Sequence, residues 1–351
     1  MKNQAVFVAL FCLCVFGDSA VAANEASTER WDRSSAMTAA RSINVDRAVY
    51  EIGHISSLAD GAATLEKLEQ LESRSDWPLP AREAALYEFT RSLAGLPREA
   101  VAAEVMQHLQ SYQARALVPH EDHGDTLVPL FNIRGAAAGV ENGWQRAEFA
   151  IEAASLLETN PAELVSAYIE SANHNQRSGY LDALGDAHLA DVAAVQDAAL
   201  EQLDRASTLT PLVGLTSVIT LDTIAVQQLL INGRGAGLAA ALGQLDERLQ
   251  TPQTADLLIY AVLKAPADNA ALAIAAWWPR LRHEAAVRDL LVEKLADPAL
   301  GAAAALALAQ DPDIQTIKML QETAGGDSLA ARRAQMALDM NRDRLVSEVQ
   351  R

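Results

Sequence analysis

The amino-acid sequence predicts an all-α protein made of stacked antiparallel helical hairpins. Half of the residues are apolar, alanine supplies many of them, and only 5% are aromatic, a composition that favours helix over strand. Apolar residues also recur at intervals of three and four along most of the chain, which is the period of an amphipathic helix. Finally, comparable segments begin at Asn269, Pro298 and Ser328, 29 and 30 residues apart, which is the length of one helical hairpin.

Residues 1–22 predict a cleavable signal peptide. Lys2 precedes an unbroken apolar run over residues 5–16, which is too short to span a bilayer, and Ala20-Val21-Ala22 supplies the small residues that a signal peptidase needs. We therefore expect a periplasmic protein in a Gram-negative cell and a secreted protein otherwise. Because Cys12 and Cys14 lie in the removed segment, no disulfide or thiolate metal site is expected in the mature chain.

The charge of the chain restricts its partners. The formal net charge is −18 at pH 7. An acidic surface repels nucleic acid and anionic lipid headgroups and attracts cationic partners. We therefore expect no nucleic-acid partner and, once the signal peptide is removed, no insertion into a membrane.

The first part of the mature chain predicts a polar leader followed by helices. Residues 23–43 are polar and rich in alanine and are expected to form a tether or a frayed first helix, with order beginning near residue 44. Residues 44–113 form the predicted N-terminal helical region of four amphipathic helices. Asn44 and Asp60 are the expected N-caps of the first two helices, and Pro80 opens the third.

The middle of the chain predicts an interruption and then further helices. Prolines and glycines break any steady helical period in residues 114–143, which we expect to form an irregular loop region. Residues 144–237 form the predicted middle helical region, with helices expected at 144–158, 161–173 and 178–206. Its apolar stretch 209–231 is interpreted as two buried helices divided near Asp222, and a short strand at 215–221 is the alternative.

Residues 238–351 predict a run of short helices with proline or small polar residues at their boundaries. The expected helices cover about 238–250, 252–264, 268–281, 283–296, 298–310, 312–324 and 328–340. Within this region, the segment DPALGAAAAL from Asp297, DPDI from Asp311 and AARRAQMAL from Ala330 resemble HEAT-type α-solenoid repeats. The resemblance covers roughly the last hundred residues. It implies a scaffold that binds other macromolecules on a curved surface, and it assigns no catalytic residue.

One polar segment is a candidate metal site. His120 and His123, three residues apart and accompanied by Asp125, would supply nitrogen and oxygen ligands to zinc or another divalent cation. Glu121 and Asp122 are candidate ligand or partner contacts, and either would serve as the base of a metal-dependent enzyme. The spacing is not that of the zinc-protease motif, and a solvated polar loop remains the alternative interpretation.

Two other motifs have a functional and a structural interpretation. Trp277 and Trp278 would stack on sugars or hold a partner peptide, or they would fill a gap between helices. Gly235-Ala236-Gly237 matches the loose glycine pattern of dinucleotide-binding turns, but no alternation of strands and helices surrounds it, which favours a turn between helices. No serine-nucleophile elbow and no phosphate-binding loop occurs in the sequence.

Together these features predict a non-catalytic helical-repeat scaffold that binds another protein or a component of the cell envelope. No cofactor is expected. The alternative is a metal-binding protein or metal-dependent enzyme that uses the loop of His120, His123 and Asp125 with a divalent cation.

Overall fold

The computed structural model describes residues 28–53 and 60–349, and the chain divides between Val140 and Glu141 into two compact units. Within the described residues lie eighteen α-helices and three very short strands, so the predicted all-α helical array is confirmed. The predicted signal peptide lies outside the described residues. None of the described helices combines the length and the apolar character that crossing a bilayer requires.

Unit 1 is built around one buried helix. Its elements are β1 (Glu29–Arg30), α1 (Arg33–Ala40), α2 (Val45–Gly53), α3 (Gly61–Ser73), α4 (Leu79–Ser92), α5 (Ala103–Ser111), β2 (Ala116–Pro119) and β3 (Leu127–Pro129). Helix α4 packs against α1, α2, α3 and β2. The predicted N-caps are confirmed, because the Asn44 side chain accepts a hydrogen bond from the amide of Arg47 (2.9 Å) and the Asp60 side chain accepts one from the amide of Ala63 (3.1 Å).

Two expectations for this half of the chain were wrong. Order begins before residue 44, since Asp32 caps α1 and both Ala36 and Ala40 are buried. Residues 114–143 are also more regular than expected: β2 pairs in parallel with β1 and antiparallel with β3, and α6 (Ile133–Thr159) starts well before Trp144. Strand β1, the parallel partner of β2, is distant from it in the sequence, so local patterns gave no sign of that pairing.

Helix α6 continues through Gly135, Gly139 and Gly143, where we expected breaks. A glycine inside a helix costs only about 1 kcal/mol relative to alanine. Over the same stretch buried residues recur at helical spacing, at Ile133, Ala137, Val140 and Trp144. The burial of this stripe outweighs the glycine penalties.

Two glycines of unit 2 are expected to respond in opposite ways to replacement by alanine. A Cβ at Gly143 meets no atom within 4 Å, so Gly143→Ala is expected to stabilise the fold by about 0.5–1 kcal/mol. A Cβ at Gly179, in α8 (His174–Gly185), would lie 2.4 Å from the backbone oxygen of Arg146. Gly179→Ala is therefore expected to cost about 1–3 kcal/mol. Urea unfolding followed by circular dichroism measures both changes, and equal effects at the two positions would contradict this account.

Unit 2 is a run of short helices after α6. They are α7 (Pro161–Glu170), α8, α9 (Leu189–Leu200), α10 (Thr210–Thr220), α11 (Thr223–Asn232), α12 (Gly235–Arg248), α13 (Thr251–Lys264), α14 (Ala267–Leu281), α15 (Ala285–Lys294), α16 (Gly301–Ala309), α17 (Ile314–Thr323) and α18 (Leu329–Val349). The two buried helices divided at Asp222 are confirmed, and the alternative strand at 215–221 is a helix. The single helix expected from Ser178 to Ala206 was wrong, because the chain turns between α8 and α9.

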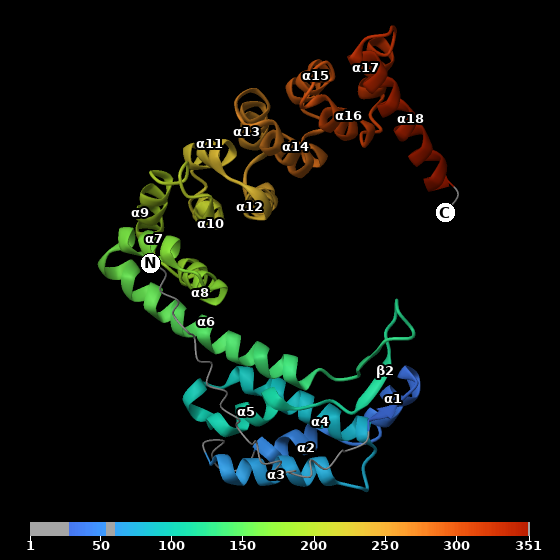
Figure 1. Ribbon diagram of the computed structural model, residues 1–351. Helices are drawn as coiled ribbons and strands as arrows, with labels where there is room; N and C mark the ends of the chain where they lie inside the picture. Colours follow the sequence, from blue (N-terminus) through green and yellow to red (C-terminus); the bar gives the residue numbers. More distant parts are fainter. Residues whose placement is uncertain (1–27, 54–59, 350–351) are drawn as a thin grey trace, which may run out of the picture. The chain divides into compact units, whose positions relative to one another are not determined.

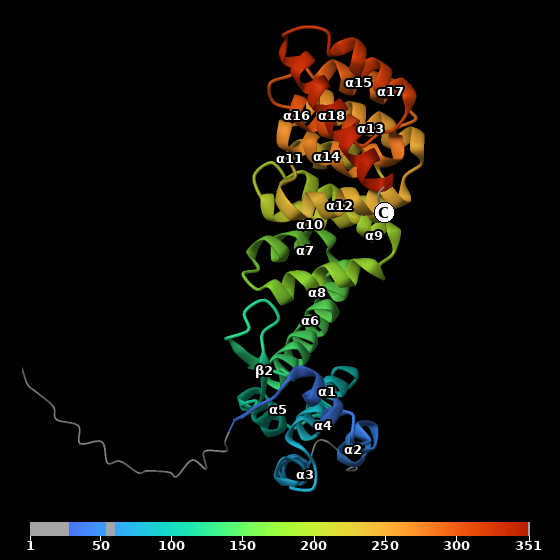
Figure 2. The ribbon, with the colours of Figure 1, turned by 90° about the vertical axis from the view of Figure 1, so that its right-hand side faces the viewer.

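The helices of unit 2 form two layers. Each even-numbered helix from α8 to α18 packs against the next even-numbered one, and each odd-numbered helix from α7 to α17 against the next odd-numbered one. Figure 1 shows the even-numbered helices on the inner side of the curve that unit 2 makes, and Figure 2 shows the hairpins stacked in chain order. We call these sets the inner and outer layers. The three comparable segments at Asn269, Pro298 and Ser328 coincide with α14, α16 and α18 of the inner layer.

The glycine pattern at the start of α12 serves helix packing. Gly235 adopts a positive φ of 64°, and a Cβ at Gly237 would lie 2.9 Å from the ring of Pro211 in α10. A Cβ at Gly214 of α10 would likewise lie 2.8 Å from that of Ala241 in α12. The turn between helices, rather than a dinucleotide-binding turn, is the interpretation that fits this close contact of α10 and α12.

Candidate functional site

The inner layer carries a large, mostly apolar groove over α14 and α16, with the start of α12 at its edge. Its volume is about 840 Å³, which is in the range of ligand and peptide sites. We call it the inner groove. The residues that line it are Arg234, Gly235, Pro266, Asp268, Asn269, Ala271, Leu272, Ile274, Ala275, Trp278, Pro279, Ala303, Leu306, Ala307 and Gln310.

Small side chains create this groove. Helix α16 has the sequence GAAAALALA, and its Ala303 and Ala307 line the groove together with Ala271 and Ala275 of α14. Because these side chains are only methyl groups, they leave space between α14 and α16 unfilled. Leu306 stands in this space with 49% of its surface exposed, which is high for a large apolar side chain. Such a concave apolar surface is suited to burying the side chains of a partner.

The groove also contains polar groups. Pro279 lies inside α14 and has no amide hydrogen, so the carbonyl of Ala275 lacks its helical donor. Both residues line the groove, which gives its wall a backbone acceptor. The buried Asn269 side chain is fixed, since its Nδ2 donates to the carbonyl oxygens of Leu230 (2.8 Å) and Gly233 (2.9 Å). The groove therefore offers apolar contact together with a few polar groups, among them the side chains of Arg234, Asp268 and Gln310.

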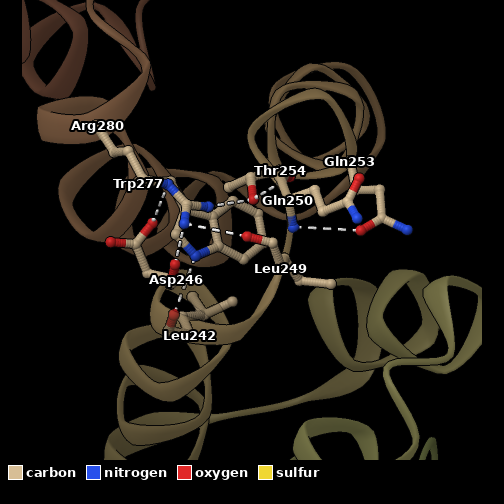
Figure 3. Close-up of polar contacts among 8 residues, drawn as sticks. All are labelled: Leu242, Asp246, Leu249, Gln250, Gln253, Thr254, Trp277 and Arg280. Carbon is tan, nitrogen blue, oxygen red and sulfur yellow. Dashed lines mark hydrogen bonds and ion pairs between the residues drawn. The ribbon is translucent and has the colours of Figure 1, made fainter.

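The paired tryptophans have different positions. The indole N–H of Trp277 donates to the carbonyl of Leu242 in α12 (2.9 Å), and the side chain is completely buried, so it has no free face for a sugar ring (Figure 3). Trp278 is 2% exposed and forms part of the groove lining. Of the two tryptophans, only Trp278 lies at a surface that a ligand would touch.

Arg280 lies beside Trp277 and joins α14 to the preceding hairpin, as Figure 3 shows. Its guanidinium pairs with the Asp246 carboxylate at 3.2 Å and donates to the backbone carbonyls of Asp246 and Leu249, the latter at 3.1 Å. It also donates to the hydroxyl of Thr254 in α13. Burial raises the pKa of Asp246 more than the charge of Arg280 lowers it. Arg280 thus forms a half-buried contact between helices rather than a surface salt bridge.

The same arrangement recurs further along the inner layer. Asn269 and Arg280 of α14 donate to carbonyls at the ends of α11 and α12, while Arg333 and Asn341 of α18 donate to carbonyls just after α15 and α16. A helix leaves its last carbonyls without internal donors. In both cases the inner helix supplies those donors to two preceding helices, so these side chains hold the hairpins in register.

The predicted metal loop is the turn between β2 and β3. His120 and His123 stack with their ring centroids 5.4 Å apart, and Nδ1 of His120 accepts a hydrogen bond from the amide of Asp122 (3.1 Å). Glu121 pairs instead with Arg33 (3.3 Å). Asp125 is exposed, and across the described residues no three His, Cys, Asp or Glu side chains are arranged to hold a metal ion. The loop brings two imidazoles together without a third ligand.

Unit 1 contains a fully buried carboxylate that the sequence analysis missed. Glu83 of α4 accepts hydrogen bonds from the amides of Arg115 (2.6 Å) and Ala116 (3.3 Å) and from the hydroxyl of Tyr112 (3.3 Å). Desolvation raises the pKa of the Glu83 carboxyl. Its partners are mainly backbone groups at the start of β2, so the side chain anchors the strand to α4.

No family model, no curated protein and no solved structure matches this chain.

Proposed function

We propose that this protein is a non-catalytic, HEAT-like helical-repeat scaffold, exported to the periplasm or secreted, that binds a partner protein in the inner groove. The observation that carries the proposal is the apolar groove of about 840 Å³ on the inner layer. Stacked two-layer hairpins present such surfaces because each hairpin adds one helix to a continuous inner face. The resemblance of the last hundred residues to HEAT-type repeats supports the same function.

The lining of the inner groove indicates the chemistry of the partner. The alanines of α14 and α16 leave room for large apolar side chains, which would contact Leu306 and Trp278. The carbonyl of Ala275, which has no amide donor at Pro279, would accept a hydrogen bond from a backbone amide. We therefore propose that the ligand is an apolar segment of a protein from the cell envelope or the surrounding medium.

A charged residue in the groove is expected to abolish partner binding. Leu306→Glu would place a carboxylate in an apolar contact, which we expect to weaken binding at least about tenfold. Immobilised wild-type protein and this variant would be exposed to an extract of the cell envelope, and the retained proteins quantified by mass spectrometry. Leu263→Glu is the matched control, because Leu263 lies on the outer layer in α13 and has a similar exposure of 53%.

The outcomes separate the proposal from its rivals. A protein retained by the wild type and by Leu263→Glu, but not by Leu306→Glu, would support a partner in the inner groove. Identical sets of retained proteins for all three would contradict it, as would turnover of a defined substrate by the purified protein. Stoichiometric metal in protein purified without added ions, lost from a His120→Ala, His123→Ala double variant, would replace the scaffold with the metal-binding alternative.

A further inference from the structure

A second groove lies at the start of unit 2, where α6 meets the turn between α8 and α9. Its volume is about 370 Å³. The floor is apolar and consists of Ala150, Ile151, Ala154, Leu157, Ala183 and Ala187. Ile151 is 73% exposed, among the most exposed large apolar side chains of the described residues. An apolar floor with an exposed isoleucine is a surface that association would bury.

The rim of this groove is acidic. Glu158, Asp182, Asp186 and Asp191 line it together with His188, and no lysine or arginine is among the lining residues. Asp182 is neutralised by Arg146 of α6, with which it forms an ion pair. The other three carboxylates have no ion-pair partner within the part of the chain that the structure describes. The groove thus combines an apolar floor with three uncompensated negative charges.

The positions of two of these carboxylates are unfavourable for the helices that carry them. Glu158 lies in the last turn of α6, and Asp186 is the C-cap of α8. The C-terminal end of a helix carries partial negative charge, so an anion there is destabilising and a cation is stabilising. A bound cationic group would therefore relieve repulsion that the free protein retains. Asp191, in the first turn of α9, is at the favourable end of its helix.

From this complementarity we infer a second docking site, in which the groove between α6 and the α8–α9 turn binds a basic amphipathic segment of a partner protein. Apolar side chains of the segment would cover Ile151 and Leu157, and its lysines or arginines would face Glu158, Asp186 and Asp191. A second copy of this chain is disfavoured as the occupant by the charge of −18. The inner groove differs in having one carboxylate and one arginine, Asp268 and Arg234, among its lining residues. The two sites therefore select different ligands.

The test uses a labelled synthetic peptide of lysine and leucine, with leucine at helical spacing, and a glutamate–leucine peptide of the same pattern. Fluorescence anisotropy with the full mature protein is expected to show binding of the first peptide only. Ile151→Ser is expected to weaken that binding about tenfold through the lost apolar contact. Because Ile151 is mostly exposed, this change is expected to leave the core intact, and circular dichroism of the variant would check this.

A charge-matched pair of triple variants separates the groove from general attraction to an acidic protein. The groove variant is Glu158→Gln with Asp186→Asn and Asp191→Asn, and we expect it to bind about tenfold more weakly. The control, Glu247→Gln with Asp256→Asn and Glu322→Gln, removes the same charge from exposed positions outside both grooves, and binding is expected to stay within about twofold. Equal weakening in the two variants, or unchanged binding by Ile151→Ser, would overturn the inference. The Leu306→Glu variant is expected to bind the lysine–leucine peptide as tightly as the wild type, because the inner groove takes no part in this binding.

Discussion

Replacing Trp277 with alanine is expected to lower the free energy of unfolding of unit 2 by about 3–5 kcal/mol. The side chain is fully buried between α14 and α12, and its N–H donates to the carbonyl of Leu242. Alanine would leave a cavity the size of an indole ring at a contact between two inner helices. Because each stacked hairpin is stabilised by contacts with its neighbours, we expect the loss of stability to be concentrated at the interface of α12 and α14.

Hydrogen exchange followed by mass spectrometry measures this effect locally. In Trp277→Ala, the amides of α12 and α14 are expected to exchange faster, while those of α7 and α18 keep most of their protection. Trp277→Phe retains a ring and loses only the donor, so a smaller cost of about 1–2 kcal/mol is expected. A loss below about 1 kcal/mol in Trp277→Ala would show that this interface does not depend on the indole.

Many helices of the C-terminal half were predictable because their boundaries have chemical markers. Pro266 precedes α14, Asp313 caps α17, and Asp222 caps α11 by accepting from the amide of Ile224. Between these markers one face of each helix is apolar. The spacing of 29 and 30 residues also identified the unit that repeats. It did not indicate that the three comparable segments form helices of the inner layer.

The missed features depend on residues far apart in the sequence. The pairing of β1 with β2 joins Glu29 to Ala116, and the hydrogen bonds from Arg115 and Ala116 to Glu83 span 32 and 33 residues. Nothing in the local pattern of either segment indicates its partner. Helix α6 continues through three glycines for a similar reason. The burial of its apolar stripe, which depends on distant parts of the chain, outweighs the helix-weakening effect of the glycines.

The inner groove was not predictable because it arises from missing side-chain volume. On the side of α16 that faces the core, Ala304 and Ala305 are completely buried. Ala303 and Ala307 line the groove, where their small side chains leave space open, although Ala307 is itself only 6% exposed. Which alanines meet a neighbouring helix depends on the rotation of α16, which the sequence does not specify. Trp278 is the one residue of the inner groove that the sequence predicted as a ligand or partner contact.

Replacing Arg280 with methionine is expected to destabilise unit 2 by about 2–3 kcal/mol. Methionine keeps an unbranched apolar stem but donates no hydrogen bond, so the carbonyls of Asp246 and Leu249 at the end of α12 lose a donor. The Asp246 carboxylate also loses its cation. The two carbonyls and the carboxylate are partly buried, so leaving them without a hydrogen-bond donor or a cation costs free energy.

A double-mutant cycle with Asp246→Asn divides this cost between the carboxylate and the backbone. If the ion pair dominates, Arg280→Met costs about 1–2 kcal/mol less in the Asp246→Asn background than in the wild type. If the carbonyls dominate, the cost is the same in both backgrounds. Arg280→Lys retains the charge but lacks the planar fork that reaches several acceptors, so it should recover only part of the stability. Because Asp246, Leu249 and Thr254 supply acceptors from two helices and the turn between them, we expect the carbonyls to dominate; full recovery of stability by lysine would contradict that expectation.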